Sequence, residues 1–195
     1  MRSVLSTVVF AGLVVSQAIG QDLDRGIEAL RKSNNSEAES LLRKAVEQQG
    51  DNGRAHAYLA LALVEQQKTS EAEPHAKKAE ELDASLGKLA LARLYVEQKK
   101  FDEAEAALKD ANPDEIQYVR GLLNFHKGRH QEAADDLEAY SSKNPEHAYA
   151  HYYAGLAYNG LKRPDKMLTH FELFLRLKPD APEARKVRSV LRAVQ

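Results

Sequence analysis

A short motif returns five times along this chain, and its period restricts the possible folds more than any other feature of the sequence. The copies are Ser36–Glu39, Ser70–Glu73, Asp102–Glu105, Gln131–Ala134 and Asp165–Leu168. Their third residues are separated by 34, 32, 29 and 34 positions. Self-similarity at such a period indicates a stack of similar supersecondary units, in which each unit buries its apolar face against its neighbours.

Apolar and small residues recur at fixed distances from the third residue of each copy. In the first copy, Leu42 and Ala45 follow Ala38 by four and seven positions, spacings that lie on one helical face. In every copy a glycine or an alanine stands twelve positions before the third residue. These small residues are Gly26, Ala60, Ala92, Gly121 and Gly155. The pattern predicts five pairs of antiparallel helices, with the small residue of the first helix facing the second.

Several residues predict where the second helices of these pairs begin. Ser36 and Ser70 each precede a glutamate by three residues, and Asp102 does the same, which is typical of a capping box. Pro164 stands just before the fifth second helix, where its missing N–H costs little. Pro74 falls about four residues inside a helix, so we expect a distorted first turn there.

Taken together, the small residues, the recurrent alanines of the motif and the closing prolines Pro145 and Pro179 resemble the tetratricopeptide repeat (TPR) family. The resemblance implies an all-α fold, a right-handed superhelical α-solenoid of about five helix-turn-helix units. The units would cover residues 22–52, 53–84, 85–113, 114–147 and 148–180. Gly50 and Ala84 stand where the first two units would have proline, and the third unit ends early at Asn112. Its second helix should therefore be short and the superhelix irregular there.

Residues 181–195 read as an amphipathic helix with apolar residues on one face and basic residues on the other. Repeat arrays need a terminal element with a polar outer side to remain soluble. We therefore expect this segment to be a C-terminal capping helix.

The N-terminal residues 1–21 are typical of a secretory signal peptide. Arg2 is followed by an uncharged run from Ser3 to Ile19, with small residues before a cut after Gly20 or Gln21. We expect an exported protein, periplasmic or secreted, with no stable membrane insertion after cleavage. A leader retained as an anchor stays open as the alternative. The sequence contains no cysteine, so disulfides do not contribute to stability.

The charge balance and the lack of catalytic motifs exclude several functions. Removing residues 1–21 takes Arg2 from the 28 basic residues and leaves all 29 acidic ones, a net charge of −2 that does not favour nucleic acid. His126 and His130, like His147 and His151, are four residues apart, but a turn should separate the first pair. No serine elbow, cysteine nucleophile or phosphate-binding glycine loop is present. We therefore expect no enzyme activity, no metal site and no cofactor.

The remaining candidate site is the concave groove that the family resemblance implies, lined by first-helix residues. The residues expected to contact a partner there are Arg93, Tyr118, Leu122, Phe125, Tyr149, Tyr152 and Asn159. Tyrosine and phenylalanine give a large contact area at a low entropic cost. The predicted function is a non-catalytic scaffold or adaptor of the cell envelope that binds a protein or peptide. The alternative is a structural protein that assembles with further copies of itself as a homo-oligomer.

Overall fold

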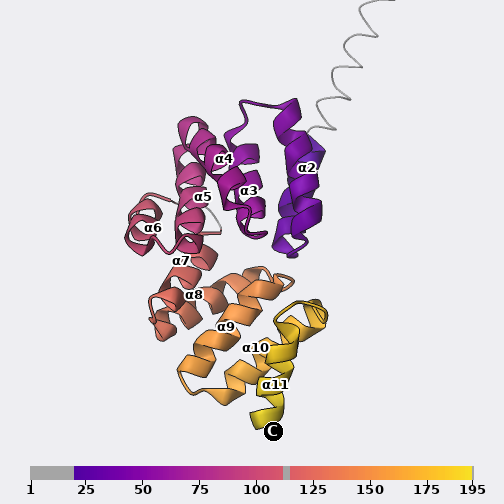
Figure 1. The fold of residues 1–195 in the computed structure, drawn as a ribbon, viewed down its shortest axis with the longest axis vertical. Helices are drawn as coiled ribbons and strands as arrows, with labels where there is room; N and C mark the ends of the chain where they lie inside the picture. The colour runs from indigo at the N-terminus through magenta and orange to yellow at the C-terminus, as the bar shows by residue number, and fades with distance from the viewer. Residues whose placement is uncertain (1–19, 112–114, 195) are drawn as a thin grey trace, which may run out of the picture.

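The computed structural model describes residues 20–111 and 115–194, and this part of the chain is made of helices and turns without a strand (Figure 1). The first helix is described from residue 20 to residue 31. The others are α2 (Asn35–Gln48), α3 (Gly53–Val64), α4 (Thr69–Leu82), α5 (Ala84–Glu97), α6 (Phe101–Leu108), α7 (Ile116–His126), α8 (His130–Lys143), α9 (Ala148–Gly160), α10 (Pro164–Leu177) and α11 (Ala184–Val194). Consecutive helices form hairpins that stack into an all-α solenoid.

The small residues of the first helices face the second helices, as the sequence predicts. A Cβ atom added to Gly26, Gly121 or Gly155 would lie 2.5 to 2.7 Å from the side chain of Leu42, Leu137 or Phe171 respectively. Ala60 and Ala92 are fully buried at the equivalent positions of α3 and α5. In these three units the large residue of the second helix thus occupies the space that the glycine leaves, which holds the two helices of a unit at close distance.

Each unit makes the turn between its two helices with one residue in the left-handed region. These residues are Ser33, Gln67, Lys99, Gly128 and Lys162, with φ between 56° and 75°. The next residue donates its N–H to the carbonyl five residues back, as Asn34 does to Ala29 at 2.8 Å. This bond pattern satisfies the free carbonyls at the end of the first helix.

The predicted capping boxes are wrong. The second helices begin before the expected cap residues, so that Ser36, Ser70 and Asp102 lie inside α2, α4 and α6, and the residues at the N-caps of these helices make no side-chain capping hydrogen bond. The tight turn already sets the direction of the second helix, which leaves no separate capping residue. Side-chain caps are found instead at first helices, where Asn52 and His147 accept the N–H of the residue three positions later at 3.1 Å.

The third unit is shorter than the others, as its early end predicts. Its second helix, α6, has 8 residues, whereas α2, α4, α8 and α10 have 14 each. A shorter helix offers less surface for the next unit to stack on in the usual register. The chain accordingly changes direction at α7, and α2 to α6 lie in one half of the molecule with α8 to α11 in the other (Figure 1).

Pro74 lies inside α4, which continues through it. The proline ring removes one hydrogen-bond donor and crowds the carbonyl four residues back. We expect Pro74→Ala to stabilise the protein by about 2 kcal/mol, less than the full helix-interior penalty because alanine also loosens the unfolded chain. Pro164→Ala is the matched control, since Pro164 is at the start of α10 and should gain nothing. Urea unfolding of both variants measures the difference, and equal shifts would contradict the prediction.

The last helix, α11, covers the end of the stack. Ala184 and Val187 are buried, while Arg185, Arg188 and Arg192 are exposed. The apolar face packs on α10 and the basic face lies in solvent.

Candidate functional site

The structure divides the predicted groove residues into two sets. Arg93, Tyr118 and Leu122 are 5%, 5% and 1% exposed. They are therefore core residues, and the prediction that they line an open groove wall is wrong. The second set is accessible: Phe125, Tyr149 and Tyr152 are half-buried and Asn159 is exposed.

The burial of Tyr118 follows from the approach of the fourth unit to the first. Glu115, just before α7, accepts hydrogen bonds from Arg31 at 3.1 and 3.3 Å and from the Tyr58 hydroxyl at 3.0 Å. Burial, and then the nearby Glu115 carboxylate, raise the pKa of Tyr58. The groove of the N-terminal half is thereby filled by the start of α7 instead of standing open.

Arg93 is held inside this filled region by two carboxylates. Its Nε donates to Glu65 at 2.8 Å and its Nη1 to Glu97 at 3.1 Å. Burial alone would lower the pKa of Arg93, but the two carboxylates raise it above its ordinary value. Arg93 therefore has its partners within the chain, where it neutralises two partly buried carboxylates.

Four rings of the last two units form a continuous accessible surface, which we call the aromatic face: Phe125, Tyr149, Tyr152 and Tyr153. The ring centroids of Phe125 and Tyr153 are 5.6 Å apart, those of Tyr153 and Tyr152 5.2 Å, and those of Tyr152 and Tyr149 6.2 Å, in edge-to-face arrangements. All four side chains are half-buried. A rigid, partly exposed row of rings gives contact area without much loss of side-chain entropy on binding.

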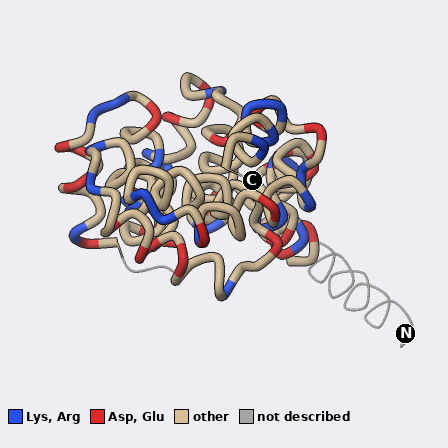
Figure 2. The backbone as a smooth tube through the Cα atoms, turned by 90° about the horizontal axis from the view of Figure 1, so that it is seen from below, with Lys and Arg blue, Asp and Glu red and all other residues tan. Residues whose placement is uncertain are grey.

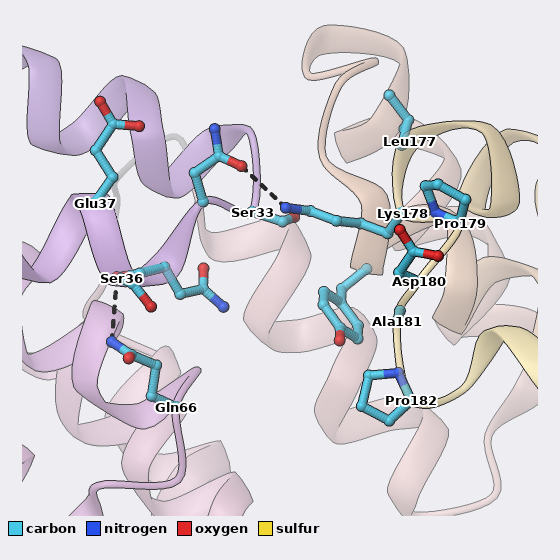
Figure 3. A pocket seen from close by; sticks show the side chains of 13 residues that line it. Ser33, Ser36, Glu37, Gln66, Leu177, Lys178, Pro179, Asp180, Ala181 and Pro182 are labelled. Carbon is cyan, nitrogen blue, oxygen red and sulfur yellow. Dashed lines mark hydrogen bonds between the residues drawn. The ribbon is translucent and has the colours of Figure 1, made fainter.

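A cleft opens beside this face, between the first and the last unit (Figure 3). One wall is residues 33–37, which are the turn and the start of α2, with Gln66; the other is residues 177–182, and Tyr149 also lines the cleft. Its volume is about 850 Å³. Lys178 crosses the cleft and donates to the side-chain oxygen of Asn34 at 2.9 Å (Figure 3). The cleft thus continues the aromatic face with amide, hydroxyl and charged groups.

The histidines are structural in this arrangement. His126 ends α7 and His130 begins α8, so a turn separates them as expected. His56 and His151 are buried. The Nδ1 atom of His56 is hydrogen-bonded to the Nδ1 atom of His75 at 2.9 Å, and His151 is joined to His170 in the same way at 3.1 Å. Within residues 20–111 and 115–194, no group of three or more His, Asp or Glu side chains is arranged to hold a metal ion.

The sequence reasoning missed the cleft and the two histidine pairs. The histidine pairs could have been found in the sequence, because His56 and His75 are 19 residues apart and His151 and His170 have the same spacing. No sequence pattern indicates the cleft, since the cleft depends on how the first and last units meet.

Charged residues of both signs are interspersed around the backbone (Figure 2). None of the helices described between residues 20 and 194 is long and apolar enough to span a membrane. The predicted signal peptide lies almost entirely outside the described residues.

Solved structures of low sequence identity share the fold. A thermophilic TPR protein from Thermus thermophilus superposes with a TM-score of 0.64 at 18% identity, over 89% of this chain and 98% of that one. YrrB, described as a TPR protein with an unusual peptide-binding site, gives 0.51 at 20% identity, over 89% and 97%. A chain of the Cut9–Hcn1 hetero-tetramer of the APC/C gives 0.63 at 19% identity, over 89% and 35%.

Sequence comparison agrees with the fold. Cell division cycle protein 27 homolog A of Arabidopsis thaliana is 30% identical over 100 residues, which are 49% of this chain and only 14% of that protein. The family model described as "Tetratricopeptide repeat" matches residues 23–86, 89–142 and 132–182. These matches cover most of the chain, which therefore belongs to the tetratricopeptide repeat family.

Proposed function

We propose that this chain is a non-catalytic adaptor that binds an extended or helical segment of a partner protein along the aromatic face and the adjoining cleft. The observation that carries the proposal is the half-exposed row of Phe125, Tyr149, Tyr152 and Tyr153, which leads into a cleft of about 850 Å³. TPR chains generally serve as protein-interaction scaffolds. The similar fold of YrrB, a protein described as having a peptide-binding site, supports the same use here.

Replacing Tyr152 tests this function. We expect Tyr152→Ala to weaken partner binding at least tenfold, about 1.4 kcal/mol, because a central aromatic contact is lost. Tyr95→Ala is the matched control: Tyr95 is also half-buried but lies on α5, away from the aromatic face. The partner is first identified by a photo-crosslinking residue at position 152 in the native cells, and affinities of the variants are then compared by calorimetry.

Two results would contradict the proposal. Equal affinities of Tyr152→Ala and Tyr95→Ala would remove the aromatic face from the binding site. Crosslinks from position 152 that join only copies of this chain, with a dimer mass in dilute solution, would favour the structural self-assembling alternative.

We further propose that the adaptor acts in the cell envelope, periplasmic or secreted. The leader-like composition of residues 1–21 supports this location. Fractionation of the native cells, with the mass of the mature chain, tests it. A cytosolic chain that retains residues 1–21 would contradict it.

A further inference from the structure

The start of α7 occupies the inner side of the first three units in the way that a bound segment would. We call that surface the N-terminal inner face, formed by Ile27, Arg31, Tyr58, Leu61, Glu65 and Arg93, which surround the start of α7. Glu115 is 6% exposed there and is held by Arg31 and Tyr58, which precede it by 84 and 57 residues. A carboxylate of the fourth unit is thus bound by the first and second units.

Tyr118, one helical turn after Glu115, borders the same face but is held by α8 and the N-cap of α9. Its ring packs against Tyr140 and His147 at centroid distances of 5.2 and 4.5 Å. Its hydroxyl is buried, beside a cavity of about 20 Å³, and has no hydrogen-bond partner among the described residues. A buried hydroxyl without a partner destabilises the arrangement that buries it. The face therefore recognises the carboxylate of its own chain well and the phenol poorly.

Two further contacts join the first unit to the last units, and both are peripheral. Lys32 and Glu146 form an ion pair at 3.3 Å with both side chains exposed, and Lys178 bonds Asn34 at 2.9 Å at the surface. Exposed pairs of this kind contribute little to stability. The contact of the first unit with the fourth and fifth units consequently depends more on Glu115 and on the residues packed next to it.

We infer that the N-terminal inner face is a second binding site, for an acidic helical segment of a partner protein, and that the start of α7 occupies it as an internal competitor. The partner's carboxylate replaces Glu115 between Arg31 and Tyr58. An apolar ring one turn later replaces Tyr118 without burying an unpaired hydroxyl. The charge of the ligand follows from Arg31, which pairs with no other carboxylate of the described residues when Glu115 leaves, whereas Arg93 keeps its two acids.

A synthetic peptide of residues 115–126 is the probe, measured by fluorescence anisotropy against the full chain. Glu115→Gln removes the charge of the internal competitor, so we expect this variant to bind the peptide at least tenfold more tightly than the unaltered chain. Peptides carrying Glu115→Gln or Tyr118→Phe should bind tenfold more weakly and several-fold more tightly, respectively. Glu103→Gln, at an exposed carboxylate of α6, is the matched control and should behave as the unaltered chain.

Three further variants test the same inference without altering Glu115, so the test does not depend on whether Glu115→Gln folds. Lys32→Ala combined with Lys178→Ala weakens the peripheral contacts without touching the site and should also increase peptide affinity. Arg31→Gln should abolish binding. Tyr152→Ala, which tests the aromatic face, should leave peptide affinity unchanged, so a failure of either site is distinguishable from a failure of the other.

Opening is measured directly by spin labels at Glu37→Cys and Lys143→Cys, two exposed positions on α2 and α8 of a chain without native cysteine. Excess peptide should lengthen the distance between the labels. Equal peptide affinity for all variants, or binding that leaves this distance unchanged, would overturn the inference.

Discussion

Acidification from pH 7.5 to pH 4.5 should reduce the free energy of unfolding by about 5 kcal/mol, the combined effect of two buried histidines. Burial lowers the pKa of His147 to about 3. Burial, and then the neighbouring His151, lower the pKa of His170 to about 4. The side chains of both residues lie in the core, at 4% and 7% exposure.

The sign of this effect follows from proton binding. In the unfolded chain a histidine has a pKa near 6.5, so it takes up a proton before the folded chain does as the pH falls. The contribution of these two neutral histidines to the free energy of unfolding is fully present above about pH 6.5. It is lost as the pH falls towards their folded pKa values of about 4 and 3. Each histidine contributes about half of the loss at pH 4.5.

His147→Asn separates the contribution of one group. The Nδ1 atom of His147 caps α9 by accepting the N–H of Ala150, and asparagine performs the same task at Asn52 of α3. The variant therefore keeps the cap without a titrating group, and about half of the acid-induced loss should disappear. Urea unfolding at a series of pH values measures both chains. A variant that loses as much stability as the unaltered chain would show that His147 does not titrate on unfolding.

Gly87→Ala should destabilise the protein by about 3 kcal/mol or more. A Cβ at position 87 of α5 would lie 2.1 Å from the backbone nitrogen and 2.2 Å from the Cα of Glu80 on α4. Backbone atoms cannot rotate away as a side chain does, so α4 and α5 would have to separate. In an open helix the same change would stabilise by about 1 kcal/mol, so the sign of the effect is itself diagnostic.

Gly50→Ala is the control for Gly87→Ala. A Cβ at Gly50 would meet nothing within 4 Å, and the expected change is small. Thermal unfolding of the two variants gives the comparison. A stability of Gly87→Ala equal to that of the unaltered chain would mean that α4 and α5 do not approach as closely as the structure shows.

The sequence was sufficient for features that arise within one unit. The close approach of the second helix at Gly121 and Gly155 depends only on the helical period and on side-chain size, and it was predicted from spacing. The helix starts were misjudged because Ser36 and Ser70 carry the composition of a cap while the turn before them already fixes the helix. At these two positions the backbone geometry of the turn, and not the local composition, determines where the helix begins.

Features that arise between distant units were not predictable in the same way. Tyr118 and Leu122 occupy groove positions in the repeat frame, yet they are buried because the fourth unit turns towards the first. That turn is the sum of small rotations between successive units, together with the shortened α6. A periodic sequence specifies each unit well, but the accumulated rotation decides which inner residues remain accessible.

The bond between Lys178 and Asn34 across the cleft has a consequence for how this array could change in length. An open solenoid tolerates an inserted or deleted repeat, since each repeat meets only its neighbours. Here a repeat added between α3 and α9 would carry the two partners apart, and a repeat lost there would drive them into collision. The bond between Lys178 and Asn34 therefore restricts the number of units between these residues, a restriction that an open linear array does not have.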